Sequence, residues 1–286
     1  MTLKSNRTEY SGGIARVFHV TTAGAAIYSE LADKYGADNV KQSNSGQGIV
    51  DALSMCVSGR GDKIRVWPGT YTPTATITIN KTCVTIEGAI PNPAATIIAS
   101  TTSGVVAFTF AATGDYSTVR NMTILMDVTG PSDCIIVPTS CPGVTLESLI
   151  IPNGADTAGL TGIDAESDYL TVENCRIFGV KLAIQSLGIN CRFRGNHIVS
   201  NLASAVGLDM QDGDNHLVEN NVFDLLHVTT TACVKIGTSA KCNQVSFKNN
   251  SYNTAAAANI TNGNSSTLGQ YGDIVSDVTT AVWASV

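Results

Sequence analysis

The chain has 286 residues, of which 14% are charged, and 17 Lys and Arg against 23 Asp and Glu give a net charge of −6. This length is sufficient for a large core in a single elongated domain. The weak charge, without a cluster of Lys or Arg, argues against nucleic acid or an anionic membrane as a partner. Residues 1–6 lack the apolar segment of a signal peptide and no run of 18 apolar residues follows, so we expect a soluble protein made in the cytoplasm.

The N-terminal part of the chain predicts a small mixed segment in front of a capping helix. Residues 1–13 are polar, residues 15–20 form a plausible strand, and residues 25–35 have a helical pattern. Apolar residues with helical spacing from residue 49 to residue 57 predict an amphipathic helix, which ends in the stretch 58–62. We assign residues 1–45 to an attachment segment, because they are too few for an independent core, and residues 46–62 to the capping helix.

Short strands are expected from residue 63 onwards, and one sequence pattern returns six times between residues 118 and 252. The copies begin at Thr118, Thr145, Thr171, Arg192, Leu217 and Ser246. A period of roughly 20–30 residues is typical of stacked supersecondary units. The repeat therefore indicates the architecture before any single motif does.

Each copy predicts a half-buried strand that ends in a turn. The second residue is apolar between polar neighbours, and the seventh is aliphatic or aromatic. The fourth is Asn, Ser or Gly, and Asn tolerates a left-handed backbone and hydrogen-bonds its own main chain. We expect the strand to turn at Asn121, Asn174, Asn220 and Asn249, and the amides of these residues to pair along the stack.

A second apolar run lies between successive copies, at residues 134–137, 162–163, 182–184, 206–208 and 233–236. Each repeat therefore carries two or three short strands. The absence of an amphipathic segment of helix length between them excludes a doubly wound βαβ sheet and argues against leucine-rich repeats. A β-solenoid with coils about 4.8 Å apart is favoured. An antiparallel sandwich is the alternative, although self-similarity at matching positions is not expected of it.

The stretch from the amphipathic helix to residue 88 resembles a known group of proteins. The helix, Gly61-Asp62, the motif "IRVWPGTY" at residues 64–71, an "ITI" strand and "VTIEG" at residues 84–88 look like the start of a pectin-lyase-like fold. This resemblance implies an all-β protein, a right-handed single-stranded parallel β-helix over residues 63–254 with a short N-terminal capping helix. Residues 255–286 would form a C-terminal tail for capping or oligomerisation. The fold hosts lyases, hydrolases and inert viral proteins, so it does not identify the chemistry.

The eight cysteines show neither a CxxC pair nor the spacing of a metal site. Several occupy positions expected to point into the core, among them Cys134, Cys175 and Cys233. We expect buried free thiols that act as small hydrophobic side chains.

Two acidic clusters are the candidates for chemistry. Asp164 and Asp209 follow comparable strands two repeats apart, so we expect them about 10 Å apart on one face. That separation is near the range for inverting glycoside hydrolysis, and Asp212 would complete a catalytic set in an enzyme. Lys181, Lys235 and His216 are candidate neighbours of this pair. The alternative is that the acidic residues only form turns at coil corners, and the polygalacturonase motifs are absent.

The second cluster, Asp209, Asp212 and Asp214, offers oxygen ligands that suit Ca²⁺, but its spacing is not that of an EF-hand. The four histidines share no metal-binding spacing. We therefore expect no resident metal and no cofactor. Aromatic residues make up 6% of the chain and are scattered, which argues against a long sugar-binding groove, and no carbohydrate-binding residue is identified.

The resemblance, combined with the missing export signal and catalytic motif, favours a structural protein of a bacteriophage virion. Such proteins include tail spikes and capsid decoration (cement) proteins, and the resemblance implies a homotrimer that contacts capsid or tail proteins, with a host-surface glycan as a further candidate partner. Assembly and surface adhesion would be its function, without catalysis. Two alternatives stay open: a polysaccharide lyase or glycoside hydrolase acting on a host glycan, and a glycan-binding module without activity.

Overall fold

The computed structural model describes residues 14–102, 104–126, 133–153, 160–227, 232–237, 239–240, 242–254, 258–262, 268–271, 274–275 and 281–285. Its helices are α1 (Ile27–Tyr35) and α2 (Gln47–Met55), with short 3-10 turns η1 (Ala37–Asn39) and η2 (Pro93–Ala95). Within the described ranges, neither helix has the length and apolar character needed to cross a membrane.

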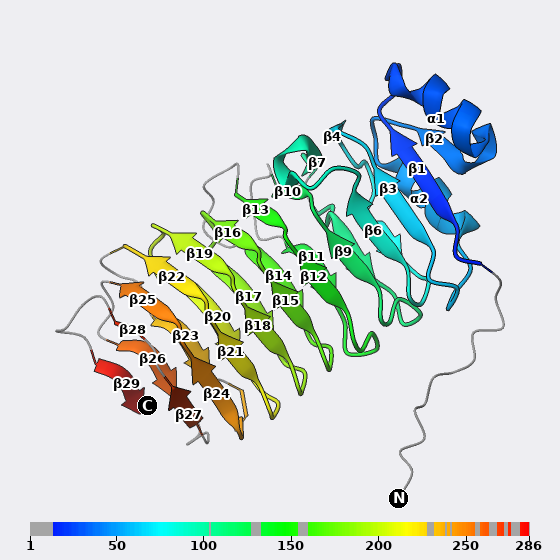
Figure 1. The fold of residues 1–286 in the computed structure, drawn as a ribbon. Helices are drawn as coiled ribbons and strands as arrows, with labels where there is room; N and C mark the ends of the chain where they lie inside the picture. Colours follow the sequence, from blue (N-terminus) through cyan, green and yellow to red (C-terminus); the bar gives the residue numbers. More distant parts are fainter. Residues whose placement is uncertain are drawn as a thin grey trace, which may run out of the picture.

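Three parallel sheets wind around one axis and form an elongated β-helix (Figure 1). Each coil contributes one strand to sheet A, then one to sheet B, then one to sheet C, and β3 to β29 make nine such triplets. Sheet A contains, in spatial order, β2 (Val40–Gln42), β1 (Val17–Thr21), β3 (Lys63–Val66), β6 (Thr85–Gly88), β9 (Thr118–Arg120), β12 (Thr145–Glu147), β15 (Thr171–Glu173), β18 (Arg192–Arg194), β21 (Leu217–Glu219), β24 (Val245–Lys248) and β27 (Leu268–Tyr271).

Sheets B and C repeat the same order along the axis. Sheet B contains β4 (Gly69–Tyr71), β7 (Thr96–Ser100), β10 (Thr123–Met126), β13 (Ile150–Pro152), β16 (Arg176–Phe178), β19 (His197–Ser200), β22 (Val222–Leu225), β25 (Ser251–Thr254) and β28 (Ile274–Val275). Sheet C contains β5 (Ile77–Ile79), β8 (Phe108–Phe110), β11 (Asp133–Val137), β14 (Thr161–Ala165), β17 (Leu182–Ser186), β20 (Val206–Met210), β23 (Ala232–Ile236), β26 (Ala258–Asn262) and β29 (Ala281–Ser285). The right-handed parallel β-helix expected from the sequence is therefore confirmed.

The six-fold sequence repeat corresponds to successive coils in register. The second residue of each copy lies in sheet A and is buried, as in the pairing of Leu146 with Val172 and of Val172 with Phe193. The seventh residue lies in sheet B and is also buried, as Ile177, Ile198 and their register partners show. The second apolar runs form sheet C, which gives three strands per coil. Matching positions thus become continuous columns of core side chains.

The fourth residue of each copy is the corner between sheets A and B, as predicted. Asn121, Ser148, Asn174, Asn220 and Asn249 all have φ between 52 and 56°. This is the left-handed region, where Asn is among the residues that fit best. The strand turns there, so the left-handed backbone explains why short polar side chains occupy this position.

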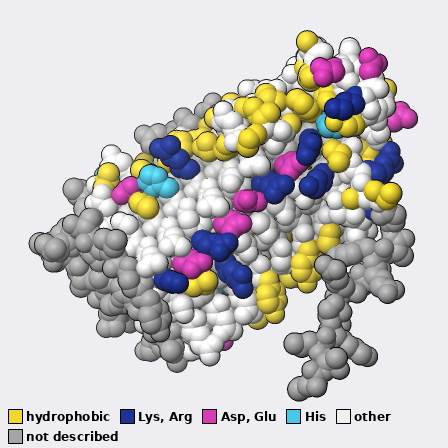
Figure 2. Space-filling model, in the orientation of Figure 1, with side chains coloured by type: hydrophobic (Ala, Val, Ile, Leu, Met, Phe, Trp, Pro, Cys, Tyr) yellow, Lys and Arg dark blue, Asp and Glu magenta, His cyan; other side chains and the backbone are white. Residues whose placement is uncertain are grey.

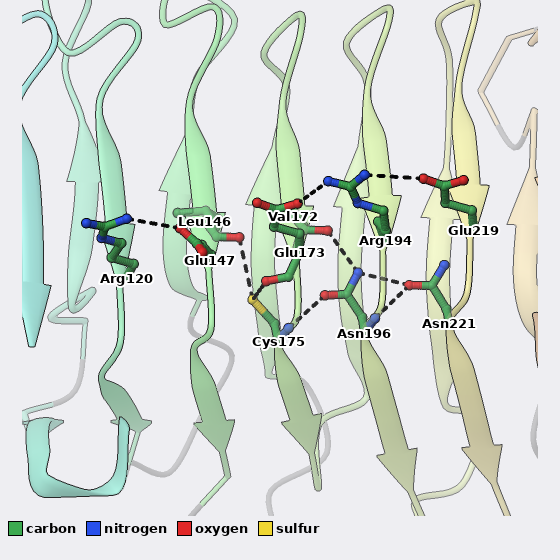
Figure 3. Close-up of polar contacts among 10 residues, drawn as sticks. All are labelled: Arg120, Leu146, Glu147, Val172, Glu173, Cys175, Arg194, Asn196, Glu219 and Asn221. Atoms are coloured by element: carbon green, nitrogen blue, oxygen red, sulfur yellow. Dashed lines mark hydrogen bonds and ion pairs between the residues drawn. The ribbon is translucent and has the colours of Figure 1, made fainter. Parts of the chain in front are cut away.

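The amide ladder expected at the corner instead runs through the fifth residue of the repeat (Figure 3). Oδ1 of Asn221 accepts hydrogen bonds from the backbone N and Nδ2 of Asn196, at 2.9 and 3.0 Å. Oδ1 of Asn250 accepts the equivalent two hydrogen bonds from Asn221. Nδ2 of Asn221 also donates to the carbonyl of Phe193 at 2.9 Å. The prediction placed the ladder one residue too early, because the corner side chain points outward and the next one points inward.

The N-terminal end of the β-helix is covered as the amphipathic pattern predicts. In α2 the residues Ile49, Ala52 and Leu53 are buried, and this helix packs against β1, β3 and β5. Strand β1 pairs in parallel with β3, so sheet A continues beyond the first complete coil (Figure 1). Asp62, whose side chain is fully buried, joins these parts.

The Asp62 carboxylate joins the chain just before β1 to the loop that follows α2. It accepts hydrogen bonds from the backbone N of Arg16 and of Val57, both at 2.8 Å, and from the Arg60 guanidinium at 2.6 Å. Burial alone would raise the pKa of Asp62, but these hydrogen bonds hold it below its usual value. The attachment role of residues 1–45 stays a prediction, and residues 1–13 lie outside the described part of the chain.

The strands continue past residue 254. Strand β27 pairs with β24, β28 with β25 and β29 with β26, so the described parts of residues 255–286 add to all three sheets. A capping or oligomerisation role for this tail stays a prediction.

The amide ladder leads to a prediction about stability. Replacing Asn221 with Ala should lower the free energy of unfolding by about 2–4 kcal/mol, because it leaves several buried backbone and amide groups without partners. Asn220→Gly is the matched control, since glycine fits the left-handed corner and the exposed side chain is lost at little cost. Chemical denaturation of both variants would test this, and equal losses would contradict the ladder's contribution.

Candidate functional site

The acidic residues singled out in the sequence lie on the outer face of sheet C. In register, Asp164 of β14 is followed by Gln185 of β17, Asp209 of β20 and Lys235 of β23. Two inter-strand spacings place Asp164 and Asp209 about 10 Å apart. The sequence reasoning therefore located this pair correctly on one face, two coils apart, with Gln185 between its members.

The environment of Asp164 favours the protonated carboxyl. Burial, which removes water from the carboxylate, and the charges of Asp133 and Glu166 raise its pKa, while the hydrogen bond from Gln185 Nε2 to its Oδ1, at 3.0 Å, acts in the opposite direction. A carboxyl whose pKa lies above its ordinary value is the kind of group that can act as a general acid.

Asp209 does not match Asp164 in accessibility. It is 9% exposed, and its Oδ2 accepts a weak hydrogen bond from Gln211 Nε2 at 3.4 Å. A pair that acts on one sugar must present both carboxylates to it, with space for water between them. Here Gln185 fills the intermediate position of the column and one carboxylate is buried, so the arrangement is a poor match to that chemistry.

Asp212 and Asp214 act at the corner that follows β20. Oδ1 of Asp212 accepts from the backbone N of Gly213 at 2.6 Å, and Oδ1 of Asp214 accepts from the backbone N and Nδ2 of Asn243 at 2.7 and 3.0 Å. The Asp212 contact is local, as in the turn-forming alternative raised from the sequence, whereas the Asp214 contacts join this corner to the next coil. Within the described ranges, no group of three or more His, Cys, Asp or Glu side chains is arranged to hold a metal ion.

The basic residues considered beside the pair separate in the structure. Lys235 is the register neighbour of Asp209, whereas Lys181 precedes β17 and lies four residues along the strand from Gln185. His216 is buried beyond the next corner, its ring 6.4 Å from that of Phe193, and burial lowers its pKa. His216 therefore belongs to the corner's interior and not to the outer face.

None of the eight cysteines, all of which lie in the described ranges, forms a disulfide, and seven of them are buried, as the sequence predicts. Burial raises the pKa of Cys56, Cys175 and Cys233 to about 12, and that of Cys191 and Cys242 to about 11. Thiols with such pKa values are not nucleophiles at neutral pH.

The outer face of sheet A carries a ladder of charged residues of both signs, one per coil, in which the like-charged Glu147 and Glu173 are neighbours (Figures 2 and 3). We call it the charge ladder, and it consists of Arg65, Glu87, Arg120, Glu147, Glu173, Arg194, Glu219 and Lys248. Its four basic and four acidic residues cancel. Ion pairs join most neighbours, for example Arg120 to Glu87 at 2.6 Å and Arg194 to Glu173 at 2.7 Å. The eight charges of the ladder sum to zero, while Lys63 and Arg192 add two positive charges to the outer face of the same sheet.

A third feature, missed from the sequence, is a pair of exposed tyrosines at the corner between sheets C and A. Tyr116 is 58% exposed and Tyr169 is 55% exposed. Gly143 occupies the same corner position in the coil between them, since Tyr116 N donates to Pro142 O and Gly143 N donates to Asp168 O. The signal in the sequence was an Asp-Tyr pair in front of two of the repeat copies. We call this feature the tyrosine corner.

The charge ladder predicts how stability depends on pH. Burial would raise the pKa of Glu87, but the hydrogen bonds from Arg120 and Arg65 outweigh it and hold the pKa below 4.5. The stabilisation is therefore present above about pH 4.5 and is lost as the pH falls below it. Glu87→Gln should cost about 1–2 kcal/mol at pH 7 and much less at pH 3, measured by denaturation at both pH values. Glu147→Gln, which loses one 3.5 Å contact at a more exposed position, is the control.

The raised pKa of Asp164 predicts the opposite dependence of stability on pH. The folded protein holds the proton of Asp164 more tightly than the unfolded chain does. The stabilisation that results is complete below pH 3.8 and is lost as the pH rises through the raised pKa of Asp164. Asp164→Asn should therefore melt at a higher temperature than the wild type at pH 7, by the equivalent of about 0.5 kcal/mol, and at the same temperature at pH 3. A lower melting temperature at pH 7 would contradict this account.

Comparison with known proteins shows the fold and nothing finer. No family model matches the chain, and no curated protein matches its sequence. Among solved structures, it resembles a pectin methylesterase from Erwinia chrysanthemi, with TM-score 0.50, 12% identity and coverage of 93% of this chain and 92% of the other. It also resembles ORF18 of Geobacillus virus E2, with TM-score 0.36, 15% identity and coverage of 92% and 75%. The tailspike protein of Dettilon gives TM-score 0.32, 12% identity and coverage of 80% and 64%. The chain therefore has the pectin-lyase-like right-handed parallel β-helix fold.

Proposed function

We propose that this protein is a structural protein of a bacteriophage virion, a capsid decoration protein or a tail spike, which acts by assembly and surface adhesion and not by catalysis. The observation that carries the proposal is an apolar band on the outer face of sheet B. Partly exposed apolar side chains form one column there, Leu125, Pro152, Phe178 and Val199, which ends at Asp224 of the next coil. Ile97, Ile150 and Val222 lie in the neighbouring column, which Arg176 and His197 interrupt. Figure 2 shows hydrophobic side chains gathered along this side of the molecule.

The apolar band supports association between copies of the chain. A contiguous apolar surface of this kind on a soluble protein marks an interaction site. The band runs parallel to the axis of the β-helix, as the neutral charge ladder does on sheet A, so three rods can associate side by side around a common axis through equivalent faces. A homotrimer is the assembly we propose, with residues 1–45 as the segment that attaches it to capsid or tail proteins.

One observation favours a second candidate, a polysaccharide lyase or glycoside hydrolase. The raised pKa of Asp164 and the position of Asp209 two coils away fit an acid and a base on one face. The burial of Asp209 and the turn contacts of Asp212 and Asp214 weigh against it. Asp209→Asn would abolish glycan cleavage without unfolding the protein if this candidate were correct.

The experiment that tests the proposal is light scattering with electron microscopy on the purified protein, beside glycan-cleavage assays on the same sample. We expect a particle of three times the 29.8 kDa chain mass and no cleavage. Phe178→Asp should dissociate this particle, because it places a charge in the apolar band. Thr171→Asp, an outward substitution on sheet A, should leave it intact. A monomeric wild type, or one that cleaves glycan, would contradict the proposal. Mass spectrometry of purified virions tests the location.

A further inference from the structure

We infer that His19 is a pH-sensitive latch, which holds α1 against the N-terminal end of the β-helix while its ring is neutral and releases this helix when the ring is protonated. The latch is a property of the single chain and operates without a partner, so it goes beyond the proposed function. Three features of the structure support it: the position of the ring, its hydrogen bonds and the charges around it.

Strand β1 lies between the two helices, and His19 points toward α1. The next residue, Val20, faces the other side, where a Cβ built on Gly48 of α2 would lie 3.0 Å from its Cγ1. Successive residues of a strand point to opposite faces of the sheet. The ring of His19, which is 1% exposed, accordingly stacks on Tyr35, the last residue of α1, with the ring centroids 4.3 Å apart. The contact between α1 and sheet A therefore includes this ring.

Helix α1 has few other contacts that hold it in place. All of its residues are described, and Leu31 is the one that is buried. The residue before it, Ala26, provides no side-chain cap. Gly24 and Gly36 lie on either side of the helix with φ of 75° and 85°, a conformation that glycine adopts without steric cost. The helix can therefore move as a unit about its two ends when its contact with His19 changes.

The hydrogen bonding of His19 fits the neutral ring. Its Nδ1 accepts a hydrogen bond from Trp67 Nε1 at 3.1 Å, so the hydrogen of the neutral ring is on Nε2. Protonation would add a hydrogen to Nδ1, which could then no longer accept from the indole of Trp67. Nε2 is buried and has no hydrogen-bond partner within the part of the chain that the structure describes. The charged ring would therefore lose one hydrogen bond and find no acceptor in exchange.

The cations beside His19 oppose its protonation. Its register neighbour on β3 is Arg65, the first residue of the charge ladder. Lys34, in the last turn of α1, lies over the ring of Tyr35. Burial, followed by the positive charges of Arg65 and Lys34, lowers the pKa of His19 from its ordinary value of 6.5.

The acidic residues of the neighbouring elements are placed elsewhere. Strands β2 and β3 contain none, and Lys41 of β2 lies on the α2 side of the sheet. On α1, Glu30 is in the first turn and Asp33 is exposed, whereas Tyr35 at the opposite end meets His19.

The next carboxylate along the column of His19 is already engaged. Glu87 follows Arg65 in register, and it accepts hydrogen bonds from both Arg65 and Arg120. A proton on His19 would therefore leave a buried cation beside two others, and movement of α1 into water relieves this cost.

The direction of the pH dependence follows from the lowered pKa. The docked position of α1 is fully stabilised above pH 6.5, and this stabilisation is lost as the pH falls through the lowered pKa of His19. Between the two values the ratio of released to docked helix should rise about tenfold for each pH unit. Release would expose the outer faces of β1 and β2, within the segment that we propose for attachment.

Hydrogen exchange of the full-length protein, measured by mass spectrometry and corrected for the intrinsic effect of pH, tests the latch. We expect the protection of α1 to fall by about tenfold for each pH unit below 6.5, while α2, on the other side of the same strand, keeps its protection. In His19→Asn the amide oxygen can accept from Trp67 and does not titrate, so the protection of α1 should not depend on pH.

Two lysine variants form a matched pair on the surface, where folding is not at risk. Lys34→Gln removes a positive charge beside the ring and should move the transition to higher pH. Lys41→Gln removes a charge on the opposite side of the sheet and should leave the transition in place.

Protection of α1 that does not change on acidification of the wild type would overturn the inference. An equal loss in His19→Asn would also do so, because it would assign the change to carboxylates such as Asp62 and Glu87. Equal loss of protection in α2 would show unfolding of the whole end, and an unchanged transition in Lys34→Gln would show that another group titrates. None of these outcomes concerns the particle size, so the proposed assembly is tested separately.

Discussion

The structure depends on in-register hydrogen bonding between successive coils. Parallel pairing repeats in all three sheets, and it fixes the position of every residue relative to the coil before and after it. Equivalent residues of successive coils are therefore neighbours, and their side chains must be able to pack beside one another. The core meets this condition with aliphatic side chains, the corners with residues that adopt positive φ, and the buried polar positions with the ladder of Asn196, Asn221 and Asn250.

Because the interior is fixed by stacking, the three outer faces are free to differ. Sheet A carries the charge ladder, sheet B carries the apolar band, and sheet C carries mixed polar residues around Asp164 and Asp209. The apolar band is the surface that we propose for contact with other copies of the chain. The tyrosine corner lies at the junction of sheets C and A, away from that band.

The predictions from sequence were most accurate where a local requirement, such as a left-handed turn, selects the residue type. The repeat located the strands of sheets A and B and the corners at Asn121, Asn174, Asn220 and Asn249, because core burial and a left-handed turn both leave a local signature. The amide ladder was placed one residue early, since the direction of a side chain at a corner follows from the turn geometry. The Asp164 and Asp209 pair was located by register, but its roles were not, because burial and neighbouring charges set them.

The sequence by itself determined the coil, its strands and its capping helix, since periodicity, turn residues and amphipathic spacing are properties of neighbouring positions. Tertiary structure alone decided which side chains share a surface. Tyr116 and Tyr169 are 53 positions apart in the chain, and only the stacking of coils brings them to one corner with Gly143 between them. The same stacking turns isolated Arg and Glu residues into the charge ladder and scattered apolar residues into a band. Surface chemistry in a β-helix is a property of columns, and a column exists only once the coils are in register.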